Sequence, residues 1–194
     1  MPDMSMTIGP IHYWLYGKIS NQEELTKFLA EEARKQGMSL DVSRYTRNLP
    51  SLEEIIDPMN IHGSLQAAID DAEKRYADLV QNLLKMHVDP ADLVNCAQEF
   101  GKKHPVTVDT PEEVFRTFED FFLDGMPCDH VNQVSDSSLA SLTWEIGADV
   151  HSAYWQGDAG MYQTLRLAVM NGMLEAGDFQ VRMLDGAHGI IERK

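Results

Sequence analysis

The stretch LASLTWEIGADVH, residues 139–151, decides the fold class that the sequence predicts. Its even-numbered residues from Ala140 to Val150 are all apolar, whereas its odd-numbered residues from Ser141 to His151 are polar or glycine. Side chains of a β-strand point alternately to its two faces, so this pattern predicts a strand with one buried face. Because strands average about five or six residues, we expect a bend or bulge at Gly147.

The residues after this stretch indicate a helix and then a hairpin. Residues 157–177 return to helical spacing, with Asp158 as the expected N-cap and Gly177 past the end. Two apolar-rich runs follow on either side of Asp185-Gly186, a dipeptide typical of tight hairpin turns. Residues 127–194 therefore predict a small antiparallel sheet built from a strand, a helix and a hairpin.

The preceding residues predict helices almost throughout. Five helices are predicted from their start signals, which are Pro10, Ser51, Asn60, Asp89-Pro90 and Thr110-Pro111. The first, second and fifth of these also have a stop signal, at Gly37, Pro58 and Gly125 respectively. In the helix after Asn60 we expect Glu73 on a solvated charged face. The predicted class is α+β: a mainly helical region, 1–126, packed on the α+β region 127–194, sharing one core as a single domain.

Composition excludes some partners. The 194 residues carry a formal net charge of -15, which would repel phosphate backbones, so we expect no nucleic-acid partner. No apolar run reaches the roughly 18 residues of a membrane span. The stretch MPDMSMTIGP does not resemble a secretory signal, so we expect a cytoplasmic protein with no membrane partner. The cysteines Cys96 and Cys128 are expected to be free thiols.

The chain has no phosphate-binding loop, zinc-protease motif or serine-hydrolase motif, so the candidate chemistry is scattered. Cys128 follows Pro127 in the connection between helix and strand, where loops often present functional side chains. With His130 or a distant histidine as base it is a candidate nucleophile, or a thiolate ligand for a metal. The alternative is a small buried thiol without reactivity.

The predicted strand carries Glu145, Asp149 and His151 on the face opposite Trp144. Two carboxylates and an imidazole on one face predict either a divalent-metal site or an acid, a base and an orienting group. The alternative is a face of ordinary solvated polar residues.

Two histidines begin long helices beside their apolar faces, His12 and His62. Together with Cys128 or His151 they would form a site with three or four ligands, suited to zinc or iron. The alternative is that each is a structural histidine bonded to a carbonyl group.

Arg166 lies among leucines and is expected to point inward, toward Glu145, Asp149 or an acidic ligand. Tyr16 and Trp155 are candidates for the lining of a pocket that holds a flat molecule.

These residues lead to a functional hypothesis with alternatives. The leading one is a small-molecule pocket between the helical region and the sheet, which acts on or senses its ligand, with a transition metal, iron or zinc, as candidate cofactor. A metal-free enzyme with Cys128 as nucleophile is the second. The third is a non-catalytic interaction or assembly protein that forms a homo-oligomer. The sequence leaves open whether the protein is an enzyme.

Overall fold

The structure, a computed structural model, describes residues 7–157 and 159–194 and confirms the α+β class. Asp158, the expected N-cap of the last helix, lies outside the described residues. The helices are α1 (Pro10–Lys35), α2 (Leu52–Ile55), α3 (Ile61–Lys85), α4 (Pro90–Lys102), α5 (Pro111–Phe121) and α6 (Gly160–Leu174), with short 3-10 turns η2 (Val42–Arg44) and η3 (Pro127–Asp129). The strands are β1 (Asn132–Ser137), β2 (Ser141–Ile146), β3 (Phe179–Met183) and β4 (His188–Arg193).

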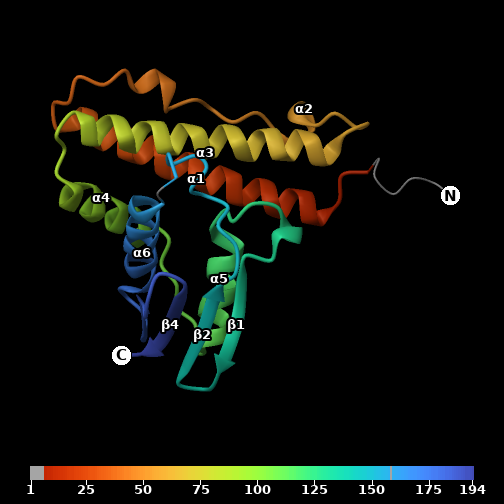
Figure 1. Ribbon diagram of the computed structural model, residues 1–194, viewed down its shortest axis with the longest axis vertical. Coiled ribbons are helices and arrows are strands. Elements are labelled where there is room, and N and C mark those ends of the chain that lie inside the picture. Colours follow the sequence, from red (N-terminus) through yellow and green to blue (C-terminus); the bar gives the residue numbers. More distant parts are fainter. Residues whose placement is uncertain (1–6, 158) are drawn as a thin grey trace.

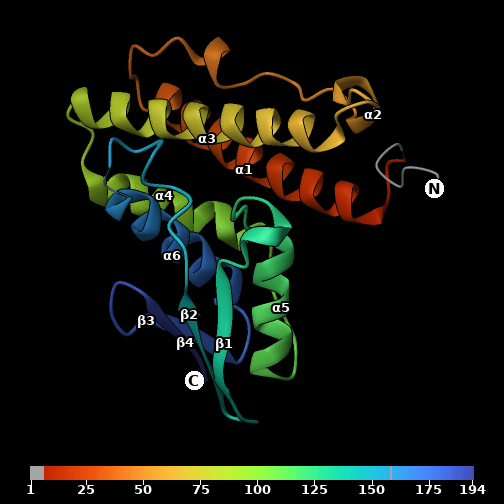
Figure 2. The ribbon, with the colours of Figure 1, turned by 45° about the vertical axis from the view of Figure 1, so that its right-hand side comes forward.

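Two long helices, α1 and α3, form one layer of the molecule. They run side by side in the same direction, and the connection between them, which contains α2, crosses back along their length (Figure 1, Figure 2). Apolar side chains such as Leu15 and Ile69 are buried between the helices. An ion pair of 2.5 Å joins Arg75 Nη1 of α3 to Glu23 Oε1 of α1. This layer lies over α4, α5, α6 and the sheet (Figure 1).

The sheet is antiparallel with strand order β1-β2-β4-β3, and it has one buried face. Leu142 and Trp144 of β2 and Ile191 of β4 are buried on this face, which contacts α5 and α6. The predicted strand and hairpin are confirmed as β2, β3 and β4, and β1 is an additional strand that the sequence did not indicate.

The prediction that the first strand runs to His151 is wrong, because β2 ends at Ile146. After Gly147 the chain forms a loop in which Asp149 Oδ1 accepts hydrogen bonds from the backbone N–H groups of His151 and Ser152. Such a turn replaces strand pairing with local hydrogen bonds. His151 therefore does not share a strand face with Glu145.

The start signals of α1 to α5 are confirmed. The side chains of Asn60 and Thr110 cap α3 and α5 by accepting hydrogen bonds from Gly63 N and Glu113 N. In contrast, α5 ends at Phe121, before the expected stop at Gly125, which adopts a positive φ of 68° in the following loop. Because the helix ends early, residues 122–126 form a loop, and Asp124 in this loop lies between α1 and α6.

Close contact with α4 fixes the position of α6. Gly101 of α4 faces Gly172 of α6, and a Cβ atom built at Gly172 would lie 2.1 Å from the carbonyl oxygen of Gln98. The backbones approach this closely only because both residues lack a side chain. One buried apolar cluster includes Leu25, Phe118, Leu142 and Leu165, so it joins the helices to the sheet. In the described part of the chain, no helix is long and apolar enough to cross a membrane.

We expect Gly172→Ala to destabilise the fold by at least the ~1–3 kcal/mol that is usual for overpacking, because its methyl group meets backbone atoms rather than a flexible side chain. Gly17→Ala is the matched control, since nothing lies within 4 Å of its added Cβ in the interior of α1. That variant should gain about 0.5–1 kcal/mol. Urea unfolding measures both, and equal stability of the two variants would contradict the close contact.

Candidate functional site

The site is built around a buried ion pair between Asp124 and Arg166. Asp124 follows α5, and Arg166 comes from the middle of α6; the two residues are 8% and 9% exposed. Arg166 Nη2 donates to Asp124 Oδ2 at 2.8 Å, and Nη1 donates to Oδ1. Burial by itself would raise the pKa of Asp124, but the charge of Arg166 and the hydrogen bonds to the carboxylate hold that pKa well below its usual range. Asp124 is therefore a permanent buried anion.

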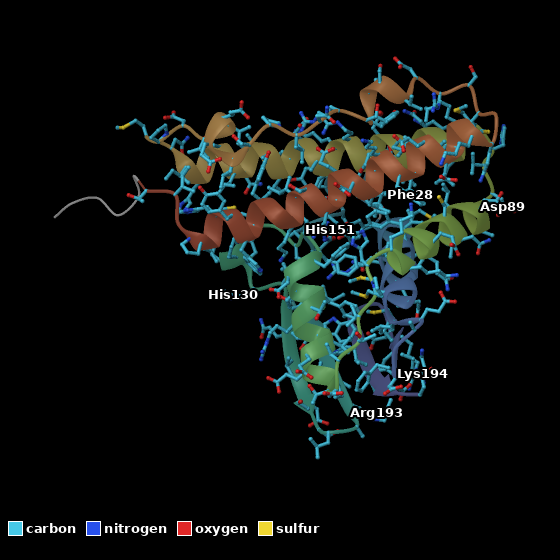
Figure 3. The ribbon with its side chains drawn as sticks, turned by 180° about the vertical axis from the view of Figure 1, so that it is seen from behind. Phe28, Asp89, His130, His151, Arg193 and Lys194 are labelled. Atoms are coloured by element: carbon cyan, nitrogen blue, oxygen red, sulfur yellow. The ribbon has the colours of Figure 1, made fainter. Side chains whose placement is uncertain are left out.

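His151 extends this pair into a longer network. Its Nε2 lies 3.2 Å from Asp124 Oδ1, and its Nδ1 lies 3.1 Å from Oε1 of Glu73, in the middle of α3. Burial would lower the pKa of His151, but the two carboxylates outweigh it and raise the pKa above its usual value. In the protonated imidazole both ring nitrogens donate, one to each carboxylate. Figure 3 shows His151 between the layer of α1 and the elements below it.

The expectation that Glu73 lies on a solvated face is wrong, because Glu73 is 1% exposed. Its second oxygen, Oε2, has no hydrogen-bond partner among the described residues, and the same holds for the Tyr76 hydroxyl and Trp155 Nε1. Trp155 is packed edge-on against Tyr76, with 5.4 Å between the ring centroids. Tyr162 stacks on His151 at 3.8 Å. The rings of Tyr76, Trp155 and Tyr162 thus pack together beside His151, near Glu73.

A cavity of about 100 Å³ lies on the other side of Asp124. We call it the Lys18 pocket; its lining residues with charged, polar or aromatic side chains are Trp14, Lys18, Glu119, Asp124, His130 and Asn132. Lys18 is only 4% exposed, and its Nζ lies 4.2 Å from the centroid of the Trp14 ring. Among the residues that the structure describes, Nζ has no hydrogen bond and no ion pair. Burial lowers the pKa of Lys18, although the charges of Asp124 and Glu119 offset part of this effect.

Glu119 of α5 has the opposite shift. Burial raises its pKa, and the neighbouring charge of Asp124 raises it further. Asn132 Nδ2 donates both to Glu119 Oε1 at 2.8 Å and to Asp124 Oδ2 at 2.9 Å, which fixes the two carboxyl groups relative to each other. The lowered pKa of the amine and the raised pKa of the carboxyl group bring the two pKa values closer together, which favours proton exchange between such groups.

The structure places the predicted catalytic residues in different surroundings. His151 lies in the buried network, and Asp149 supports its backbone from the adjacent turn. Glu145 is exposed on β2, opposite His188 of β4. Cys128 is an exposed free thiol on η3, and it does not line the Lys18 pocket, although its neighbours Pro127 and His130 do.

The residues predicted to bind a cofactor are also divided. Arg166 points inward as expected, but its partner is Asp124 rather than Glu145 or Asp149. Trp155 is buried beside Tyr162. Tyr16 lies elsewhere, in a groove between α1, α3 and the connection that joins them, where its hydroxyl donates to the carbonyl oxygen of Pro50.

The predicted metal ligands do not form one group. The rings of His12 and His62 lie 6.0 Å apart at the start of α1 and α3, and His12 Nδ1 accepts a hydrogen bond from Gly9 N. Both nitrogens of His151 are engaged by carboxylates, and Cys128 is exposed. Within residues 7–157 and 159–194, no three side chains of His, Cys, Asp or Glu are grouped so that they could hold a metal ion. Metal binding stays a prediction.

Sequence reasoning missed Lys18, Glu73, Glu119 and Asp124. One signal was present for Asp124, because an arginine among leucines requires a carboxylate nearby. Lys18 also had a signal: it lies between Leu15 and Gln22 on the face of α1 that is buried. The same spacing is found for many lysines that bury only their aliphatic stem and keep the amine in water, so it does not predict a buried lysine by itself. The pairing of these residues depends on the tertiary fold.

Comparisons with models of protein families, with curated proteins and with solved structures found no match. The chemistry available to the site therefore follows from its own side chains. They provide an amine without a hydrogen-bond partner in the described chain, a carboxyl group with a raised pKa, and a buried ion network behind them.

We expect Asp124→Asn to destabilise the fold by about 3–5 kcal/mol, because it removes one partner of a buried ion pair and leaves Arg166 uncompensated. The control is Glu112→Gln, which removes an exposed ion pair with Arg116 and should change stability by no more than about 1 kcal/mol. Urea unfolding distinguishes the two. A small effect of Asp124→Asn would contradict the central role of the pair.

His151 makes stability depend on pH. Because its pKa is higher in the folded than in the unfolded chain, its contribution is complete below the unfolded value of roughly 6.5 and is lost as the pH rises through the folded value. We expect His151→Gln to remove this decline in unfolding free energy above about pH 6.5. An NMR titration of the His151 imidazole in the folded protein measures this pKa directly. A midpoint below the unfolded value would refute the predicted dependence of stability on His151.

Proposed function

We propose that the protein binds a small polar molecule in the Lys18 pocket and acts on it or senses it. The observation that carries this proposal is Lys18, a residue that is only 4% exposed, lines the cavity, and has no hydrogen-bond partner for its ammonium group in the described part of the chain. A charge that is largely withdrawn from bulk water lowers stability unless polar groups compensate for the lost hydration. A ligand oxygen in the cavity would accept the hydrogen bonds that the protein leaves unmade.

The size and lining of the pocket limit the ligand. A water molecule occupies about 30 Å³ in the liquid, so a cavity of about 100 Å³ suits a molecule of only a few non-hydrogen atoms. Trp14 forms an aromatic wall, and Asn132 and Glu119 add polar groups. Such a ligand binds weakly, since even the best small ligands gain at most about 1.5 kcal/mol per atom.

Geometry favours Lys18 over the other candidate centres. His151 uses both ring nitrogens within the network, so it has no free nitrogen for a metal ion in this arrangement. Cys128 lies outside the lining of the pocket. The metal-dependent protein and the cysteine enzyme remain hypotheses, which metal analysis of the purified protein and alkylation of Cys128 relative to Cys96 test directly.

We expect acetamide, used as a millimolar probe, to shift the NMR resonance of Lys18 Cε saturably in the lysine-labelled full chain. Acetamide is neutral, fits the size of the cavity and offers a carbonyl oxygen to the ammonium group. Lys18→Met should abolish binding and raise the melting temperature, because it removes a buried charge at similar volume.

The matched control is Lys27→Met, on the same helix, in which the Lys18 resonance should still respond to acetamide. A response that is absent in the wild type, or a heat of acetamide binding that persists in Lys18→Met, would reject the pocket as a binding site.

A further inference from the structure

We propose that Lys18 is a nucleophile that forms a Schiff base with a small uncharged aldehyde, with Glu119 as the proton donor. This inference rests on the proposed function, because it names the substrate class and the reaction of the same pocket. It is carried by the position of Lys18, a buried residue whose amine has no hydrogen-bond partner in the described chain, in a cavity that a carboxyl group also lines.

The amine is held ready for attack. Lys18 belongs to the interior of α1, where Leu15 and Gln22 on the same face are also buried, so its stem is fixed against the core. In the described chain no carboxylate or carbonyl oxygen is bonded to Nζ, so the nitrogen is not tied to an acceptor. A lysine that is desolvated in this way loses its proton more readily, and the neutral amine is the form that attacks carbonyl carbon.

Trp14 suits the cationic intermediate of this reaction. Its ring lies 4.2 Å from Nζ, at a distance where an aromatic face attracts a cation. A protonated Schiff base carries its positive charge on the same nitrogen, so the ring can stabilise it without movement of the helix.

Glu119 can supply and recover the proton. Asn132 holds Oε1, whereas Oε2 has no hydrogen-bond partner among the described residues and is available to carry the proton. Because burial and Asp124 raise the pKa of Glu119, its acid form is populated closer to neutral pH than that of an exposed glutamate.

The reaction balances without an oxidant or a further reactant. Lys18 Nζ bonds to the aldehyde carbon as the C=O π bond breaks, one proton passes from the nitrogen to the oxygen, and a carbinolamine forms. Glu119 then protonates the hydroxyl group, the C–O bond breaks and water leaves, while the nitrogen lone pair forms the C=N bond. The nitrogen gives up its remaining proton to Glu119, which restores the acid, so the products are one imine and one water molecule.

Charge and volume define the substrate class. A carboxylate or phosphate group on the substrate would stabilise Lys18 as the ammonium ion, which is the form that does not attack carbonyl carbon, so the substrate is uncharged. The cavity of about 100 Å³ encloses only a small molecule. A two-carbon hydroxyaldehyde such as glycolaldehyde fits both limits.

The test treats the full chain with glycolaldehyde, adds borohydride to reduce any imine, and maps the modified lysines by peptide mass spectrometry. We expect a hydroxyethyl group on Lys18 at a rate at least about tenfold above that on Lys27, which lies on the same helix and provides an internal control. Glu119→Gln should slow labelling of Lys18 about 10²-fold, the lower end of what general acid catalysis contributes, and leave labelling of Lys27 unchanged.

Acetamide, which cannot form a Schiff base, separates the two proposals. If acetamide shifts the Lys18 resonance but glycolaldehyde labels Lys18 no faster than Lys27, the pocket binds small molecules and the Schiff-base inference is overturned. If neither probe acts at Lys18, both proposals are overturned. Equal labelling rates of Lys18 in the wild type and in Glu119→Gln would remove Glu119 as proton donor.

Discussion

The buried carboxylate of Asp124 is the constraint on which the rest of the structure depends. It accepts hydrogen bonds from Arg166 of α6, from Asn132 of β1 and from His151 of the loop after β2. A buried carboxylate without these partners would cost several kcal/mol, so the partners must be in place together. Glu73 then joins the network to α3 through His151. The ion network therefore links the layer of α1 and α3 to the sheet region.

Much of the fold was predictable because its signals are local. The caps at Asn60 and Thr110 and the turn at Asp185-Gly186 act on neighbouring backbone groups, and the structure confirms the elements that they predicted. The end of the first strand was not predictable from alternation alone. The apolar and polar residues continue to alternate after Gly147, but the Asp149 turn competes with strand pairing there and ends β2.

The site was harder to predict, because its residues are far apart in the sequence. His151 and Arg166 were recognised from their residue types, yet their common partner Asp124 looked like part of a helix end. Glu73 lies in a run of charged residues, and only the position of α3 against the loop at His151 buries it. Local patterns indicate which residues are unusual, whereas the tertiary fold decides which of them meet.

The same network explains the state of Lys18. The carboxylate of Asp124 is bonded to Arg166 and His151, and one oxygen of Glu119 is bonded to Asn132. The Lys18 amine therefore has no hydrogen-bond partner within the described chain. The most direct test is an NMR titration of Lys18 Cε in the lysine-labelled protein. A titration midpoint below the ordinary lysine pKa of roughly 10.4 is the predicted result. A midpoint at or above that value would mean that the amine is stabilised as an ion and would contradict this account.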